Sequence, residues 1–344
     1  MPAVPPGDVL LDVQNLSVTF DAGRRDLRAV VDVNLTLRRG EVLAIVGESG
    51  CGKSVTASTI VGLTRGPHTR IGGRILYRGR DLATASEREL RDVRGKEISM
   101  VFQDALAALN PVHRVGDQVA EMVLLHNDAR RPNAMSQAVR MLDEVGVAHA
   151  AAAARRYPHE FSGGMRQRAM TAIALVNNPA VLIADEPTTA LDVTIQAQVL
   201  DLIDRLRRDH GTAVILITHD LGVVAQFADR VAVMYAGTIV EEGTCEELFR
   251  DPQHPYTWGL LGCIPRIDRP RLASLASIEG SPPAITEMPE GCRFRPRCPY
   301  AFERCFDAPA LDERRRQGHL DACFLTPHQK QALRPAGVVA ETPA

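Results

Sequence analysis

The chain has 344 residues, of which 45% are hydrophobic and 24% are charged, and its formal net charge is −2. This length suits two domains, or one large domain with an extension, and the composition is that of an ordinary soluble globular protein. The near-neutral charge gives no reason to expect a nucleic-acid partner, which needs a basic surplus or a concentrated basic face. No signal peptide opens the chain, and no apolar run approaches the ~20 residues that span a bilayer, so we expect a cytosolic protein with reduced thiols.

Short apolar runs predict the strands of the fold. Residues 16–20, 33–37 and 73–79 alternate apolar and polar side chains, as in antiparallel strands that are exposed on one face. Three continuous apolar runs predict parallel strands that are buried on both faces. They are residues 42–46, 181–184 and 213–217.

Helices are predicted between and after these strands. Residues 194–211 predict a helix that ends at Gly211, and strand, helix and strand in this order imply a right-handed crossover in a parallel sheet. Residues 104–178 also have a helical pattern, and residues 231–243 predict a hairpin that turns at Ala236 and Gly237. The apolar face of the helix 194–211 comprises Ile195, Val199, Leu202, Ile203 and Leu206.

A glycine-rich motif with the chemistry of phosphate binding follows the strand 42–46. "GESGCGKS" matches G-x-x-x-x-G-K-[ST], whose glycines let backbone N–H groups surround phosphates. Lys53 is expected to reach the β- and γ-phosphates, and Ser54 to bind Mg²⁺. The predicted nucleotide-binding residues are Gly47, Glu48, Ser49, Gly50, Cys51, Gly52, Lys53 and Ser54.

Two carboxylates end the strand in "VLIADEP". Asp185 is placed as the strand-end Mg²⁺ ligand of P-loop enzymes is placed. Glu186, one residue further, would point at the γ-phosphate and polarise the attacking water. The sequence therefore predicts hydrolysis as well as binding.

A second helix start, in "FSGGMRQR", can also hold an anion. Ser162 is a natural N-cap, and Gly163 and Gly164 leave backbone N–H groups bare. Because one terminal phosphate cannot easily use both anion sites of a chain, we expect this site to serve a nucleotide held by another subunit. One face of the helix is predicted to carry Met165, Ala169, Ile173 and Val176.

These motifs, with "VFQD", "TTALD" and "ITHD" in the same order, resemble those of the nucleotide-binding subunits of ABC transporters. The resemblance covers roughly residues 10–250. It implies an α/β P-loop ABC ATPase core: a parallel sheet with flanking helices, an antiparallel β subdomain and a helical subdomain at about 104–178. It also implies ATP and Mg²⁺ as cofactors, and a dimer that holds two ATP molecules between P-loop and signature faces.

The same resemblance implies the roles of further residues. Gln103 matches the glutamine that senses Mg²⁺ and the attacking water, and His219 matches the switch histidine that contacts the γ-phosphate. Asp192 matches the aspartate that links the two sites of the dimer, and Phe20 is the candidate for stacking on adenine. The signature residues, which would close over the other subunit's γ-phosphate, are Ser162, Gly163 and Gly164.

Two segments are similar to the ATP-binding subunits of oligopeptide and dipeptide importers: "DPQHPYTWGLLGCIP" (251–265) and "VFQDALAALNPVHRVGDQV" (101–119). This similarity implies a peripheral protein at the cytoplasmic face of the membrane. Its partners would be a second ABC ATPase subunit, two permease subunits and an extracytoplasmic solute-binding protein. Residues 105–112 would receive a permease helix, or else belong to the core of the helical subdomain.

Other functions remain open at this point. Importer ATPases for nickel or another small solute belong to the same subfamily, and an ATPase subunit does not itself recognise the transported solute. A soluble ABC ATPase of DNA repair or translation, or a dimeric regulator without a transport partner, is an alternative from another class. Co-purification with two hydrophobic permeases would separate transport from both.

A loop-rich extension, residues 251–344, is predicted after the ATPase domain 1–250. Four of the seven cysteines lie in its segment 292–323, with the spacing C-x₅-C-x₆-C-x₁₇-C. Neither the common zinc spacings nor the ferredoxin spacings match, but a loop-rich segment with four reduced cysteines gains stability from a metal. The four are Cys292, Cys298, Cys305 and Cys323.

Three states of these cysteines stay open: an iron–sulfur cluster, a zinc site and free thiols. The resemblance to the importer extension, in which such a cysteine group is associated with a cluster, favours [4Fe–4S] with a structural or oxidation-sensing role. Interleaved arginines could offset thiolate charge. They are Arg293, Arg295, Arg297 and Arg304.

Single residues outside these motifs are given structural interpretations. His254 and Tyr256 are expected to pack the extension against the core, and His319 to lie on the surface. Cys51 starts a helix, where the pKa of a thiol tends to fall. We nevertheless interpret Cys51 as a tolerated small side chain.

Overall fold

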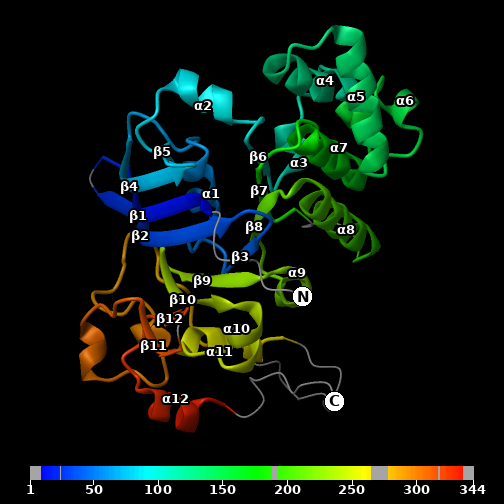
Figure 1. Cartoon of the computed structure of the whole chain (residues 1–344). Helices are drawn as coiled ribbons and strands as arrows, with labels where there is room; N and C mark the ends of the chain where they lie inside the picture. Colours follow the sequence, from blue (N-terminus) through cyan, green and yellow to red (C-terminus); the bar gives the residue numbers. More distant parts are fainter. Residues whose placement is uncertain (1–8, 24, 188–192, 265–277, 317, 336–344) are drawn as a thin grey trace. The chain divides into compact units, whose positions relative to one another are not determined.

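The computed structural model describes residues 9–23, 25–187, 193–264, 278–316 and 318–335. Two compact units make up the chain (Figure 1). The first consists of residues 1–11, 36–42 and 77–217, and the second of residues 12–35, 43–76 and 218–344. Among the described residues, no helix combines the length and apolar character that a membrane crossing needs.

Three parallel strands form the sheet of the first unit: β6 (Ile98–Val101), β7 (Val181–Asp185) and β8 (Ala213–Ile217). Every residue of β7 and β8 is buried, which confirms the prediction of strands covered on both faces. The helix α8 (Val193–His210) connects them, as predicted.

The predicted apolar face of α8 is confirmed where the structure describes it. Val199, Leu202 and Ile203 are buried. The side chains of Ile195 and Leu206 lie outside the described part.

The helical region predicted at 104–178 is confirmed and gathers into one group in Figure 1. Its members are α3 (Ala105–Ala108), α4 (Val115–His126), α5 (Arg131–Glu144), α6 (Ala150–Ala153), the 3₁₀ turn Pro158–Glu160 and α7 (Gly163–Leu175).

The single apolar face predicted for α7 is wrong in part, because Met165 and Ile173 are only half-buried while Gln167 and Thr171 are buried. The reason is that α7 contacts α3, α4, α5 and β6, so that it is covered on several sides.

The strands β1 (Val9–Asp21), β2 (Asp26–Arg38) and β4 (Thr69–Tyr77) lie largely in the second unit, in the order β2–β1–β4. They contain the predicted segments 16–20 and 33–37, and β4 covers the predicted segment 73–79 up to Tyr77. The helix α1 (Lys53–Ile60) also lies in the second unit, whereas the short elements β5 (Arg80–Asp81) and α2 (Glu87–Val93) belong to the first.

A second set of strands in this unit has the order β11–β12–β10–β9–β3. β3 (Val42–Val46) is parallel to β9 (Arg230–Tyr235), and β9 is antiparallel to β10 (Thr238–Thr244). The predicted hairpin is confirmed: Ala236 and Gly237 both have positive φ, at 46° and 87°, as a tight two-residue turn requires.

The C-terminal extension contains more regular structure than its composition predicts. β11 (Asp312–Arg316) pairs with β12 (His319–Asp321), and β12 pairs with β10, opposite Glu241 and Glu242. Local sequence does not predict these strands, because β12 depends on the edge of β10 for its pairing and β11 depends on β12. The helices are α10 (Cys245–Arg250), α11 (Pro255–Gly262) and α12 (Pro327–Leu333), with 3₁₀ turns at Arg295–Arg297 and Glu303–Phe306.

Aromatic side chains of the extension share a core with the strands that carry the P-loop. Tyr256, Trp258 and Phe294 belong to the same buried cluster as Val46 of β3 and Val233 of β9. The predicted packing of Tyr256 is therefore confirmed. His254 is also buried, and its Nδ1 caps α11 by accepting the Tyr256 N–H at 3.1 Å.

A buried carboxylate fastens the extension to β10. Glu241 is fully buried and accepts the N–H groups of Gln253 at 2.6 Å and of His254 at 2.8 Å. His319 pairs with the same carboxylate at 2.8 Å and is itself only 2% exposed. The prediction of His319 as a surface residue is wrong, because a buried carboxylate needs hydrogen-bond partners that are buried with it.

Candidate nucleotide-binding site

The P-loop lies between β3 and α1, and two of its glycines cannot be replaced without a clash. Gly47 has φ 153°, and a Cβ there would lie 2.1 Å from the carbonyl oxygen of Met234. Gly52 has φ 107°, and its Cβ would lie 2.8 Å from the carbonyl oxygen of Ala29. The loop shape therefore depends on neighbouring strands as well as on its own sequence.

Lys53 is folded back over the P-loop and is only 5% exposed. Its Nζ donates to the carbonyl oxygens of Gly47 at 2.8 Å and of Glu48 at 3.0 Å. Phosphate oxygens are stronger acceptors of a charged donor than carbonyls are, so they can replace these two partners. Ser54, the next residue, starts the exposed side of α1.

His219 and the P-loop share a cavity. A space of about 280 Å³ is lined by His219 together with Gly47 and Glu48. Asp220 caps α9 (Leu221–Phe227) by accepting the N–H of Gly222 at 2.9 Å, which fixes the backbone next to His219. The predicted switch histidine and phosphate loop are thus brought together within the second unit.

Phe20, the predicted adenine-stacking residue, lies in β1 and is half-buried. No contact assigns it to a nucleotide. Its role stays a prediction.

In the first unit, the two predicted acidic residues end β7. Asp185 is 4% exposed, and Glu186 has φ 48° and donates its N–H to the carbonyl oxygen of Ile217 at 2.9 Å. Gln103 donates from Nε2 to Oε2 of Glu186 at 2.9 Å. The structure therefore brings Gln103 and Glu186 into direct contact. Asp192 lies outside the described residues.

The signature forms the N-terminus of α7, as predicted. The Ser162 hydroxyl accepts the N–H of Met165 at 3.3 Å, which is N-capping geometry. Ser162 and Gly163 are exposed, Gly164 is half-buried, and a Cβ at Gly163 would meet open space. The start of this helix is consequently accessible.

Gln167 is a functional candidate that the sequence pattern did not predict. It is 3% exposed, and its Nε2 donates to the carbonyl oxygen of Pro187 at 2.6 Å. Pro187 directly follows Glu186, so this hydrogen bond ties the signature helix to the segment that carries the acidic residues. Its neighbours in sequence are Arg166 and Arg168, so local sequence gave no signal that Gln167 is buried.

The segment after Gln103 has both a buried and an exposed apolar part. Leu109 is 2% exposed, whereas Phe102 and Val112 are 38% and 75% exposed. Gln118 holds the turn through hydrogen bonds to the backbone of Asn110. The buried Leu109 agrees with the interpretation of residues 105–112 as core of the helical subdomain, and the permease contact stays a prediction.

Cys51 is a buried thiol of the P-loop. It is 4% exposed, and burial raises its pKa despite the nearby Lys53 ammonium. The expected fall of the pKa at a helix N-terminus is wrong here, because desolvation outweighs the charge. The interpretation of Cys51 as a tolerated small side chain agrees with this burial.

The four cysteines of the extension line one small cavity, together with Phe294 and Phe324. All four are free thiols, and burial raises the pKa of Cys298 to about 11 and of Cys323 to about 12. Four sulfur donors around one cavity have the donor chemistry of a thiolate-bound metal group, although burial disfavours the thiolate form in the absence of a metal. However, no three His, Cys, Asp or Glu side chains in the described ranges are arranged to hold a metal ion, so the expected metal site has no geometric support.

The interleaved arginines have other partners than the thiols. Arg295 stacks on the ring of Phe306, and Arg304 on the ring of Phe324. Arg293 donates to the Ala236 carbonyl, and Arg297 pairs with Glu48. Burial raises the pKa of Cys292 and the charge of Arg295 acts against that rise, so the expectation that the arginines offset thiolate charge has support at Arg295.

Comparison with known proteins agrees with this geometry. The ABC transporter family model matches residues 30–189, and the model of the oligopeptide/dipeptide transporter C-terminal region matches residues 240–305. The solved ATP-binding cassette MJ0796, in a dimeric post-hydrolysis state with ADP and Pi, aligns with a TM-score of 0.63 and 26% identity. It covers 68% of this chain and 98% of that one. Fold and motifs thus define a P-loop ATPase of the ABC class, which uses ATP with Mg²⁺.

Curated relatives narrow the class further. The oligopeptide transport ATP-binding protein OppD of Salmonella typhimurium is 50% identical over 94% of this chain and 95% of its own length. The dipeptide transport ATP-binding protein DppD of Bacillus subtilis is 49% identical over 92% of this chain and 94% of its own length. The chain belongs to the oligopeptide/dipeptide-type ATP-binding proteins of ABC transporters and hydrolyses ATP.

Proposed function

We propose that the chain powers the import of oligopeptides or dipeptides, as a peripheral subunit on the cytoplasmic face of the membrane. The match of residues 240–305 to the oligopeptide/dipeptide transporter C-terminal region carries this proposal. Uptake of labelled di- and tripeptides into vesicles that contain the whole complex tests it. Uptake of nickel without uptake of peptides would instead support the small-solute alternative.

The proposed partners are a second ABC ATPase subunit, two permeases and an extracytoplasmic binding protein. The exposed side chains of Phe102 and Val112 support a permease contact beside Gln103. Val112→Asp should reduce co-purification with the permeases and leave ATP binding intact. Leu333→Asp, at an exposed residue of the extension, is the matched control. Equal co-purification of both variants would contradict the contact.

In the proposed reaction, the P-loop and the signature act on one ATP from two subunits. Lys53 binds the β- and γ-phosphates, and Phe20 stacks on adenine. Bound Mg²⁺ would neutralise charge on the phosphates. Its ligands would be Ser54, Asp185 and Gln103.

Water attack and signal transfer are assigned to the remaining motif residues. Glu186 polarises the water, with Gln103 holding its carboxylate by the 2.9 Å hydrogen bond, and His219 contacts the γ-phosphate. Asp192 links the two sites. The signature of the other subunit closes on the γ-phosphate through Ser162, Gly163 and Gly164.

Removing the water-polarising carboxylate tests the mechanism. Glu186→Gln should lower kcat by roughly 10²- to 10⁴-fold, because general-base catalysis contributes that much, while ATP binding persists. Wild-type hydrolysis by this variant would rule out the assigned role.

We propose, as a separate role, that residues 292–323 carry a [4Fe–4S] cluster, with zinc as the alternative. The shared cavity of the four thiols supports it. The ligands would be Cys292, Cys298, Cys305 and Cys323. Iron, sulfide and zinc should be assayed in anaerobically purified protein, with Cys298→Ser as the test variant and Cys245→Ser, outside this cavity, as the control. Metal-free wild-type protein would exclude both groups.

We also propose that residues 1–250 are the nucleotide-binding domain, with the helical subdomain at about 104–178, and that residues 251–344 form the extension. The separate family matches at 30–189 and 240–305 support this division. Because Tyr256 and Val46 share a core, we expect the extension to depend on the nucleotide-binding domain for its stability.

A further inference from the structure

Arg297, next to Cys298 in the extension, reaches the P-loop. Its Nη1 donates to Oε2 of Glu48 at 2.6 Å, and its Nη2 donates to Oε1 at 3.0 Å. Two parallel bonds between a guanidinium and a carboxylate form the most directional ion pair that proteins use. The Arg297 side chain is 5% exposed and that of Glu48 is 27% exposed, so water screens the pair only in part.

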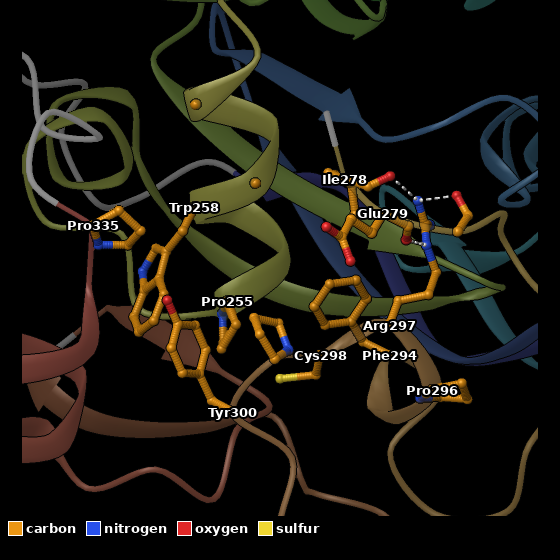
Figure 2. Close-up of a pocket in the computed structure, with 14 residues that line it drawn as sticks. Pro255, Trp258, Ile278, Glu279, Phe294, Pro296, Arg297, Cys298, Tyr300 and Pro335 are labelled. Carbon is orange, nitrogen blue, oxygen red and sulfur yellow. Dashed lines mark hydrogen bonds between the residues drawn. The ribbon is translucent and has the colours of Figure 1, made fainter. Parts of the chain in front are cut away.

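The guanidinium is oriented by backbone on its other side. Nε donates to the carbonyl oxygen of Glu279 at 2.9 Å, and Nη2 donates to those of Ile278 at 3.3 Å and Gly280 at 3.2 Å (Figure 2). Nη1 also approaches the Tyr235 hydroxyl at 3.4 Å. Arg297 thus lies in the wall of a cavity of about 670 Å³, and it cannot turn away from Glu48 without breaking these bonds.

Glu48 is held from three directions, two of which belong to the extension. Its N–H donates to the Tyr256 hydroxyl at 2.8 Å, and its carboxylate accepts from Arg297. Its carbonyl oxygen accepts from Lys53, the residue expected to bind phosphate, at 3.0 Å. The backbone of the second P-loop residue is therefore positioned by groups more than 200 residues away in sequence.

A second arginine of the same segment supports the other end of the loop. Arg293 donates to the carbonyl oxygen of Ala236 in the hairpin turn. The next residue, Gly237, donates its N–H to the carbonyl oxygen of Cys51 at 2.8 Å. Both halves of the P-loop thus connect to the segment that follows Cys292.

The ion pair also sets the charge of the loop. A free Glu48 carboxylate would repel a triphosphate that enters the P-loop, and Arg297 neutralises it. We propose that Arg297 is a positioning residue for ATP binding: acting through Glu48, the C-terminal extension sets the conformation and charge of the P-loop. This inference rests on the proposed assignment of the P-loop as the ATP phosphate site.

The test compares variants of the full-length chain. The Kd for ATP is measured by titration calorimetry, and KM and kcat are measured in the assembled transporter. Arg297→Met should raise both Kd and KM about tenfold, the effect of one uncompensated charge in a partly buried site, and change kcat less than about twofold. Arg297→Lys, which keeps the charge without the fork, should give an intermediate Kd and provides a second variant if Arg297→Met folds poorly.

A double-mutant cycle separates this role from general destabilisation. In a Glu48→Gln background, Arg297→Met should change the Kd less than about twofold, because no carboxylate remains to be neutralised. Arg304→Met, which removes a charge stacked on Phe324 in the same segment, is the matched control and should bind ATP as wild type does.

Three outcomes test the proposed role of Arg297 and the assignment of the P-loop on which it rests. Wild-type ATP affinity in both Arg297 variants, or an equal loss in the Glu48→Gln background, would overturn the proposal. Lys53→Ala tests the P-loop assignment by itself. If Lys53→Ala still binds ATP with wild-type affinity, the assumed phosphate site is wrong, whatever Arg297 does.

Discussion

The P-loop and the signature are both glycine-rich starts of helices, but their surroundings differ. In the P-loop, Lys53 is 5% exposed and Glu48 is held by the extension, and glycines are enforced by neighbouring backbone. In the signature, Ser162 and Gly163 are exposed, and a Cβ at Gly163 would have no neighbouring atom within 4 Å.

The difference separates a preformed site from an open one. The P-loop is shaped by contacts within its own unit, so we expect it to bind phosphate in an isolated subunit. The signature provides N–H groups and a helix dipole without enclosing anything, as a surface that closes on another subunit's nucleotide would. Variants of the two motifs should therefore fail in different assays.

The largest effect is expected at the buried lysine. Lys53→Ala should lower the ATP affinity of the isolated chain by roughly 10³-fold, because a charged donor inside a water-excluded loop is lost. Equilibrium nucleotide binding to the full-length monomer measures this. A loss smaller than about tenfold would mean that the P-loop is not the preformed site.

A core substitution tests whether the extension supports the P-loop. Trp258→Ala should lower the free energy of unfolding by about 3–5 kcal/mol, since this side chain is 2% exposed in the core that contains Val46. Urea unfolding measures it. Leu333→Ala, at a 40% exposed residue, should change stability by less than about 0.5 kcal/mol. Similar values for both would show that the extension is an independent appendage.

A variant of the signature should leave ATP affinity unchanged and lower kcat, whereas Lys53→Ala should lower ATP affinity. Gly163→Asp should fold normally, because space surrounds the new side chain, and bind ATP with wild-type affinity as an isolated chain. In the assembled transporter its added negative charge should lower kcat by roughly 10²-fold. Gly163→Ala controls for the loss of glycine. An equal loss of ATP affinity in the isolated chain would erase the distinction between the motifs.

The effect that is smallest per unit of change concerns the acid stability of the extension. Burial lowers the pKa of His254 to about 3, so the unfolded chain binds a proton between pH 6.5 and 3 that the folded chain does not. Stability should therefore fall as pH decreases through this range, by at most about 1.4 kcal/mol per pH unit from this group.

His254→Asn keeps a capping acceptor without a titrating ring and should flatten that dependence. His319 should have the opposite effect on the pH dependence of stability. Burial lowers its pKa, but the hydrogen bond and charge of Glu241 outweigh burial and raise it, so its contribution is lost as pH rises. The free energy of unfolding, determined at pH 4, 5, 6 and 7, measures the contributions of both histidines. An unchanged slope in His254→Asn would refute the assignment.

Local sequence determined the elements whose signals are short-range. The buried strands β3, β7 and β8 are continuous apolar runs, the hairpin needs φ > 0 at Ala236 and Gly237, and Ser162 caps α7 because its hydroxyl accepts a nearby N–H. Motif order also predicted Lys53, Gln103, Glu186 and His219 as site candidates. These features depend on residues within about one turn or one strand.

Tertiary structure decided what depends on partners distant in sequence. β11 and β12 exist because β10 offers an edge, His319 is buried because Glu241 is, and burial rather than the helix end sets the Cys51 pKa. The bond of Arg297 to Glu48 joins residues 249 positions apart, which no local pattern encodes. Desolvation and long-range pairing arise only when the chain is packed, and for that reason the tie between extension and P-loop had to be found in the structure.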